Sequence, residues 1–300
     1  MIFRHDEEYR IHLGDCITHM PELPAACMDM AVFSPPFPSL YAYTPLPEDI
    51  GNSEDLRAEA KIHLSFFYRQ IGRLVKPGRV IVVHVAQIPR MKRAGGQGLF
   101  DFRGLNIRLG ERAGLSFEYD WVVRKNPQAQ AIRGKAWELK FQGVETDRSM
   151  SRGALSDYLL KFRVPGENAV PIDGEGEVSR EDWIKWAECC WSDIKETGTL
   201  NVAEGRAEND TKHICPLQLQ VIERLVRLYT NPGEIVFTPF AGIGSELYTA
   251  LKLGRRSYGI ELKKEYHAAA LKNCERAIRA REEEQRTLFG GAAMEGTVNG

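Results

Sequence analysis

One stretch near the C-terminus constrains the fold more than any other part of the chain. Residues 234–240 (EIVFTPF) form a short apolar run, residues 246–254 (ELYTALKLG) repeat apolar side chains at helical spacing, and residues 256–262 (RSYGIEL) form a second short run. Gly242 and Gly244 stand before the helical stretch, where the chain must turn tightly. The pattern predicts a strand, a glycine turn, a helix and a second strand.

The rest of the chain continues this alternation of short apolar runs and helical stretches. The other predicted strands are residues 9–15, 28–33, 79–86 and 116–124. The other predicted helices are residues 61–75, 105–113, 217–229 and 263–285. Strands that alternate with helices are typical of an α/β sheet covered by helices on both faces, which is the fold class that we expect.

Composition excludes several classes of protein. A chain of 300 residues with 43% hydrophobic content can bury a core, so a disordered chain is excluded. The 40 Lys and Arg residues are matched by 41 acidic residues, and the net charge of −1 excludes a protein that coats nucleic acid by bulk charge. No run approaches the ~20 apolar residues of a membrane span, and the first ten residues lack a signal-peptide core. We therefore expect a cytoplasmic protein without a membrane partner.

Cysteines and histidines give no sign of a metal site. The six cysteines contain no CxxC pair, and the seven histidines are scattered along the chain. We expect reduced or buried thiols, ordinary surface or core histidines, and no metal.

Glu261 strengthens the case for a ligand at the glycine turn. It follows Gly244 by 17 residues and ends the next strand, where a carboxylate can accept hydrogen bonds from both hydroxyls of a ribose. The dinucleotide fingerprint requires a third glycine, but residue 247 is Leu, which argues against NAD. S-adenosylmethionine, which carries ribose and adenine but no phosphate, fits the pattern better. A glycine turn beside a solvated Glu is the simpler alternative.

A second motif, FSPPF (33–37), directly follows the predicted strand 28–33. Pro35 and Pro36 have fixed φ angles and no N–H groups, so the loop presents rigid carbonyls together with the Ser34 hydroxyl. An exocyclic NH₂ of a planar base can donate to the Ser34 oxygen and the Pro35 carbonyl while the ring stacks on Phe37. Taken alone, a Pro-Pro turn is more often an ordinary loop.

The two motifs together resemble a known family. Ser-Pro-Pro-Phe at 34–37 and Phe-Ala-Gly-Ile-Gly at 240–244 are similar to the catalytic and cofactor motifs of the DNA amino-methyltransferases, in the permuted order of the β group. The similarity extends through residues 14–37, 73–83, 212–226 and 254–262. It implies a Rossmann-like sheet for S-adenosylmethionine, circularly permuted, with an inserted target-recognition region.

The resemblance also implies how the chain is divided. The expected parts are a catalytic half (1–120), the last strands with the target-recognition region (121–212), a cofactor-binding half of the same domain (213–285) and a flexible tail (286–300). The permutation requires the first strand (9–15) to lie beside the strand that ends at Glu261, so that both ends of the chain close one sheet.

Several further cofactor contacts follow from the resemblance. Asp15 is expected to accept from the adenine amino group, with the Cys16 N–H facing a ring nitrogen. His213 resembles the segment that flanks the methionine end of the cofactor. The other residues assigned to the cofactor lie in the glycine loop, namely Thr238, Phe240 and Ser245. Thr238 departs from the family, which usually has Asp there; an ordinary turn Asp15 and a helix-entry His213 are the alternatives.

The implied reaction is direct methyl transfer to an exocyclic nitrogen of a base flipped out of double-stranded DNA. Ser34 and Pro35 hold the amino protons, and no cysteine nucleophile is needed. Ser at the first motif position occurs more often with cytosine-N4 enzymes of the family, and Asp or Asn more often with adenine-N6 enzymes. The prediction is cytosine N4, with adenine N6 as the alternative.

DNA contacts are expected outside the cofactor half. Residues 121–163 hold nine basic residues against four acids, interleaved with aromatic side chains. The nine are Arg124, Lys125, Arg133, Lys135, Lys140, Arg148, Arg152, Lys161 and Arg163. The acidic segment 164–212 is expected to be an insertion outside the sheet that assists recognition. Tyr41 and Tyr43 are candidates to fill the gap left by the flipped base, and a solvated charged face or inward-packed aromatics are the alternatives.

Other functions remain open at this point. An RNA or protein methyltransferase would use the same sheet. A nucleotide-dependent dehydrogenase would explain the glycine loop but not SPPF, and a non-catalytic DNA-binding module would explain only the basic stretch. The sequence also leaves open a homodimer and a cognate restriction nuclease.

Overall fold

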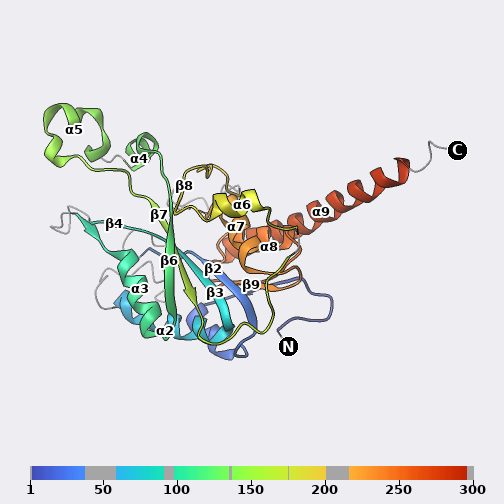
Figure 1. Ribbon diagram of the computed structural model, residues 1–300. Coiled ribbons are helices and arrows are strands. Elements are labelled where there is room, and N and C mark those ends of the chain that lie inside the picture. The colour runs from blue at the N-terminus through green and yellow to red at the C-terminus, as the bar shows by residue number, and fades with distance from the viewer. Residues whose placement is uncertain are drawn as a thin grey trace.

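The computed structural model describes residues 2–37, 59–90, 98–134, 137–174, 176–200 and 216–295. Its centre is an eight-stranded sheet in the order β1-β10-β9-β2-β3-β7-β6-β8 (Figure 1). The strands are β1 (Tyr9–Leu13), β2 (Met28–Phe33), β3 (Val75–Ala86), β6 (Ser116–Val123), β7 (Asp157–Arg163), β8 (Cys190–Trp191), β9 (Ile235–Thr238) and β10 (Arg256–Glu261). A separate two-stranded sheet joins β4 (Ile88–Pro89) to β5 (Leu99–Phe100).

Helices cover both faces of the sheet, as the alternating pattern predicts. The longer helices are α2 (Glu59–Leu74), α3 (Phe102–Arg112), α7 (Leu219–Tyr229), α8 (Ser245–Lys252) and α9 (Lys264–Glu295). The shorter ones are α1 (Cys16–His19), η1 (Met20–Glu22), α4 (Pro127–Gly134), η4 (Trp137–Leu139), α5 (Phe141–Thr146), η5 (Arg148–Met150) and α6 (Arg180–Trp186). Within these described segments, no helix is both long and apolar enough to cross a bilayer.

The central strand β2 is buried along its whole length. Because successive side chains of a strand point to opposite faces, Ala31 and Phe33 pack on the side of α2, whereas Met30 and Val32 pack on the side of α7. Each face therefore has its own apolar core, and β2 contributes to both.

The two ends of the chain meet in this sheet. Strand β1 pairs parallel with β10, with Leu13 opposite Glu261, and the Gly14 N–H donates to the Glu261 carbonyl at 2.9 Å. The pairing confirms the expectation that the first strand completes the sheet beside the strand ending at Glu261.

Two strands of the middle segment belong to the sheet, and one of them was not expected there. Strand β7 carries buried Leu159, Leu160 and Phe162 and pairs antiparallel with β3 and β6. Strand β8 pairs with β6 and lies inside segment 164–212, which was expected to stay outside the sheet. The tryptophans Trp186 and Trp191 explain the difference, because they pack into the core on the α7 side.

The predicted elements are found close to their expected positions, with β2 at the predicted residues. Helix α9 is the clearest departure, because it continues to Glu295, into the segment expected to be a flexible tail from 286. Pairs spaced four residues apart, Arg279 with Glu275 and Arg286 with Glu282, support its exposed turns.

Candidate active site at the carboxyl edge of the sheet

The two motifs lie at the carboxyl ends of neighbouring parallel strands. Strand β2 leads into Ser34 and β9 leads into the glycine loop, and the two strands pair with Ala31 opposite Phe237. From β2 the chain continues to β3 on one side, and from β9 it continues to β10 on the other side. The point between β2 and β9 is therefore a topological switch. Ligands of open α/β sheets bind in the crevice at such a point. Ring contact between Phe33 and Phe240, with centroids 6.0 Å apart, joins the two motifs.

The glycine loop adopts the conformation that its glycines permit. Gly242 has φ 53° and Gly244 has φ 85°, both in the left-handed region that other residues rarely adopt. A Cβ on Gly244 would stand 3.1 Å from that of Ala270 on α9, so the loop lies directly against this helix. Asn273, one turn further along α9, is buried and donates from Nδ2 to the Ile243 carbonyl at 2.8 Å. Asn273 was not expected from the sequence, because no motif surrounds it.

The position of the missing third glycine is occupied by Leu247, which is fully buried. Close packing of helix on strand is achieved instead by Gly259 in β10, where an added Cβ would stand 2.8 Å from the Leu247 Cδ1. A small residue on the strand thus replaces the small residue that the dinucleotide pattern places on the helix.

Glu261 is held in place by the loop. Its Oε2 accepts from the Gly242 N–H at 2.7 Å, and its Oε1 accepts from the Lys263 N–H at 2.8 Å. Two backbone donors therefore fix the orientation of this carboxylate at the end of β10. Glu246, in the first turn of α8, is buried as well, and burial, with a smaller contribution from the charge of Glu261, raises its pKa to about 8.

Asp15 and Cys16 lie beside Glu261, because Leu13 pairs with Glu261 at the end of β1. Asp15 caps α1, and its carboxylate oxygens accept from the Ile17 and Thr18 N–H groups at 3.1 Å each. The turn role considered from sequence is thus present, at the edge where the adenine is expected. Cys16 is buried, and burial raises the pKa of its thiol well above the ordinary value.

Three of the four remaining candidates for cofactor contact lie in the described segments. Thr238 and Ser245 are buried, and neither hydroxyl has a hydrogen-bond partner among the described residues. An unpartnered buried hydroxyl is costly in a folded protein, so both positions are consistent with a polar ligand. Phe240 packs on the core between Phe33 and Phe67. His213 lies outside the described residues.

The catalytic motif is rigidly supported. Pro35 is buried, and Phe37 is half-buried against Phe102 of α3, with ring centroids 5.5 Å apart. The Ser34 hydroxyl lies in a short hydrogen bond with Nδ1 of His84. The motif therefore packs on α3 through its aromatic end and on β3 through its hydroxyl.

His84 belongs to a chain of polar contacts behind Ser34. Its Nε2 lies 3.0 Å from Asp157 Oδ2, and the same oxygen lies 2.6 Å from Lys125 Nζ. The side chains of His84, Asp157 and Lys125 are between 10% and 14% exposed, so this series of contacts is shielded from solvent. The sequence did not single out His84 among histidines expected to be ordinary surface or core residues; a lone histidine in the apolar run RVIVVHVA was the only available signal.

The expected DNA surface is only partly consistent with the structure. Arg124, Arg133 and Lys140 are exposed, and Arg133 lies 3.5 Å from Glu196. Lys125 is instead engaged with Asp157, as described above. Lys135, Tyr41 and Tyr43 lie outside the described residues.

Three residues of the predicted basic and aromatic surface are buried or paired instead. Trp121 is 1% exposed and packs on Trp191. Lys161 and Arg163 both pair with Glu118. Because β7 is an interior strand, its cations must find partners across the sheet, which the charge count of the segment did not indicate.

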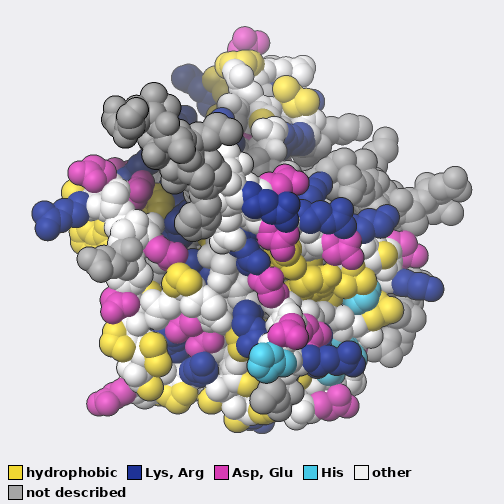
Figure 2. Space-filling view, turned by 90° about the vertical axis from the view of Figure 1, so that its right-hand side faces the viewer, with side chains coloured by type: hydrophobic (Ala, Val, Ile, Leu, Met, Phe, Trp, Pro, Cys, Tyr) yellow, Lys and Arg dark blue, Asp and Glu magenta, His cyan; other side chains and the backbone are white. Residues whose placement is uncertain are grey.

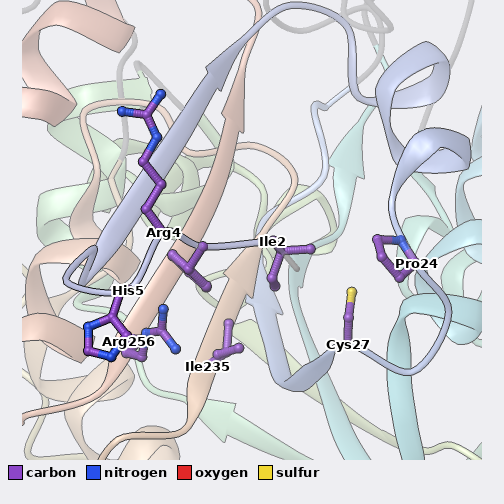
Figure 3. Close-up of a pocket in the computed structure, with 8 residues that line it drawn as sticks. Ile2, Arg4, His5, Pro24, Cys27, Ile235 and Arg256 are labelled. Carbon is purple, nitrogen blue, oxygen red and sulfur yellow. The ribbon is translucent and has the colours of Figure 1, made fainter.

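Acidic and basic side chains are interleaved on the face seen in Figure 2, in keeping with the near-zero net charge. No group of three or more His, Cys, Asp or Glu side chains in the described ranges is placed to hold a metal ion. A pocket of about 420 Å³ opens at the opposite edge of the sheet, where Ile235 begins β9 and Arg256 begins β10 (Figure 3).

Known proteins are similar to this chain in sequence. A family model described as DNA methylase (N6_N4_Mtase) matches residues 28–272. The chain is 42% identical over 266 residues to the type II methyltransferase M.BglII of Bacillus subtilis, covering 86% of this chain and 66% of that protein. It is 24% identical over 269 residues to the type II methyltransferase M.MthZI of Methanothermobacter thermautotrophicus, covering 81% and 70%.

Two solved structures have a similar fold. TTHA0409 of Thermus thermophilus, a putative DNA modification methylase, superimposes with a TM-score of 0.68 at 22% identity, over 90% of this chain and 96% of that chain. PvuII DNA methyltransferase, described as cytosine-N4-specific, gives a TM-score of 0.64 at 18% identity, over 95% and 94%. The family match covers both motifs and the strands that carry them, and the chain therefore belongs to the DNA methylase family, the S-adenosylmethionine-dependent amino-methyltransferases that its sequence resembles.

Proposed function

We propose that this protein transfers a methyl group from S-adenosylmethionine to N4 of a cytosine flipped out of double-stranded DNA. One observation carries the proposal: the SPPF motif and the glycine loop end two adjacent parallel strands at the topological switch point. A base held at Ser34 and a nucleoside held at Glu261 would then face the same crevice. The basic residues exposed on α4 and beside α5 are the expected contacts to DNA phosphates.

The cofactor half contains the groups that a nucleoside requires. The Glu261 carboxylate is already oriented by two backbone N–H groups, and the space beside Gly242 is open, since an added Cβ would meet nothing within 4 Å. Asp15 and the Cys16 N–H lie at the neighbouring strand end, in the position assigned to the adenine. Thr238 and Ser245, on either side of the glycine loop, carry buried hydroxyls without a partner among the described residues. Bound S-adenosylmethionine supplies a methyl group on a positively charged sulfur.

The catalytic half supplies acceptors for an amine. The lone pair of an exocyclic amino nitrogen is delocalised into the base, so the nitrogen is a poor nucleophile. Hydrogen bonds from its two protons to the Ser34 oxygen and the Pro35 carbonyl favour a pyramidal nitrogen with its lone pair directed at the methyl group. Phe37, supported by Phe102, offers a flat face for the ring.

The choice of cytosine N4 over adenine N6 rests on Ser34. In the family that the sequence resembles, Ser at this place accompanies cytosine-N4 enzymes more often. A neutral hydroxyl is also a weaker acceptor than the carboxylate that is common in adenine-N6 enzymes.

The identity of the methylated nucleoside tests the proposal. DNA incubated with the purified protein and isotopically labelled S-adenosylmethionine is digested to nucleosides, which are separated and identified by mass spectrometry; RNA and a protein mixture serve as parallel substrates. We expect label in the N4-methylcytosine nucleoside from DNA alone. Label only in N6-methyladenine would replace the target base and keep the enzyme class, whereas label only in RNA would refute DNA as the substrate.

A further inference from the structure

The polar chain behind Ser34 is assembled by sheet register. In the parallel pair of β2 and β3, Phe33 is opposite Val83, so the next positions, Ser34 and His84, are neighbours. In the antiparallel pair of β3 and β7, Asp157 is opposite Ala86, two residues beyond His84 and therefore on the same face. Lys125 reaches Asp157 from two residues beyond Val123, which pairs with Asp157. Four strands thus bring these four side chains to one face of the carboxyl edge.

The charges around His84 bear on the direction of its hydrogen bond with Ser34. Burial alone would raise the pKa of Asp157, but its interactions with His84 and Lys125 lower it below the ordinary value, so the carboxylate is ionised. The ammonium group of Lys125, 2.6 Å from the same carboxylate oxygen, provides a cationic partner. An imidazole that carries its single proton on Nε2, the nitrogen 3.0 Å from Asp157 Oδ2, has Nδ1 as an acceptor.

An acceptor at Nδ1 determines what Ser34 can do. A serine hydroxyl is both a donor and an acceptor, and a freely rotating one can bind an amine or a carbonyl. With its hydrogen given to His84 Nδ1, the Ser34 oxygen can only accept.

We propose that His84, held by Asp157 and Lys125, is a positioning residue that makes Ser34 an obligate acceptor and so selects an amino group over a carbonyl group at the target base. The inference rests on the proposed function and extends it. Cytosine and adenine carry an amine at the reacting position, whereas uracil and hypoxanthine carry a carbonyl oxygen there. The polar chain therefore excludes bases that differ from the substrate by this one group.

Two substitutions at one position separate positioning from packing. His84→Asn keeps an oxygen near the place of Nδ1 that can accept the Ser34 hydrogen, whereas His84→Leu is apolar and has no acceptor. We expect the single-turnover rate of methyl transfer to fall by ~10-fold to ~10²-fold in H84L and to stay within about threefold of wild type in H84N. Affinity for S-adenosylmethionine, measured by calorimetry, should be unchanged in both. A wild-type rate in H84L, or a rate in H84N as low as in H84L, overturns the proposal.

Target-base discrimination provides the second readout. Each protein's affinity for duplexes that carry the mapped target site is compared with its affinity for duplexes in which the target amine is replaced by a carbonyl oxygen, as uracil for cytosine or hypoxanthine for adenine. The ratio of these two affinities should favour the amine by ~10-fold or more in wild type relative to H84L. The changed base pairing affects both proteins equally and cancels in this ratio. Equal discrimination by the two proteins contradicts the proposal.

A control and a second variant cover the case in which H84L does not fold. Lys161→Met breaks a buried ion pair with Glu118 between the same strands β6 and β7, without touching Ser34, and should keep the wild-type rate per folded molecule.

Asp157→Asn is nearly isosteric and can donate its amide to Nε2, which reverses the tautomer; it should slow transfer by ~10-fold. An unchanged rate in D157N overturns the proposal by itself. If the wild-type protein methylates no DNA, the proposed function fails; if it does and these variants match it, only this inference fails.

Discussion

The carboxylate of Glu261 is the single side chain on which the cofactor site depends most. Two backbone N–H groups orient it, and it ends the strand next to the glycine loop. Glu261→Ala should weaken S-adenosylmethionine binding by about 10²-fold, since hydrogen bonds to a charged acceptor contribute roughly 1.5–3 kcal/mol each. Calorimetric titration measures this, with the exposed Glu265→Ala on α9 as the control. Wild-type affinity in E261A would falsify the assignment.

Ser34 is the side chain on which the methyl transfer itself depends most. Removing its hydroxyl takes away one acceptor for the amine while leaving the glycine loop intact. Ser34→Ala should therefore lower the rate of methyl transfer by ~10²-fold or more, with unchanged cofactor affinity. Single-turnover transfer of labelled methyl to DNA measures the rate. A rate close to wild type would mean that the amine is held elsewhere.

Glu246 predicts a pH dependence of stability. Its pKa is raised from 4.5 to about 8 by burial, so between these values the folded protein holds a proton that the unfolded chain has released. Stability contributed by the protonated form is complete below pH ~4.5 and is lost as the pH rises through about 8.

Glu246→Gln removes this titration with little change in shape. Between pH 5 and pH 8, the free energy of unfolding of wild type should fall relative to that of E246Q by a few kcal/mol, measured by urea denaturation without cofactor. Glu111→Gln, at an exposed position on α3, should run parallel to wild type. A parallel course for E246Q as well would show that Glu246 is ionised in the folded protein.

At the scale of elements, helix α8 and strand β10 pack closely because residue 259 is glycine. An added Cβ would stand 2.8 Å from Leu247 and 3.2 Å from the Ala241 Cβ. Gly259→Ala should destabilise the protein by roughly 1–3 kcal/mol, the usual cost of overpacking a filled core. Gly153→Ala, where nothing lies within 4 Å, is the matched control. Equal stability of G259A and wild type in urea denaturation would mean that Leu247 moves aside without cost.

At the scale of the whole molecule, a nearly neutral protein needs a local basic surface to bind DNA. Figure 1 shows α4 and α5 standing apart from the sheet, and Arg133 and Lys140 are exposed there. Reversing both charges should weaken DNA binding and lower the slope of log affinity against log salt by about 1 for each lost phosphate contact. Cofactor affinity should not change. Fluorescence anisotropy at several salt concentrations measures the slope, with Arg112→Glu on α3 as the control; an unchanged slope would place the DNA surface elsewhere.

The sequence by itself determined the parallel half of the sheet and both motifs. Apolar runs of strand length and helices with apolar faces are local patterns, so β2, β9, β10 and the helices between them were predictable within a few residues. Gly242, Gly244, Glu261 and Ser34 could be proposed because glycine conformation, fixed proline geometry and strand-end carboxylates act over short stretches of chain.

Only the tertiary structure revealed the contacts that depend on register between distant strands. His84, Asp157 and Lys125 are separated by many residues, and each looks ordinary alone; pairing of β2, β3, β7 and β6 places them behind Ser34. The same reason explains why Lys161 was expected on a DNA surface but lies buried beside Glu118, since β7 is an interior strand. Charge and periodicity are properties of a segment, whereas burial and partnership depend on which segments the fold brings together.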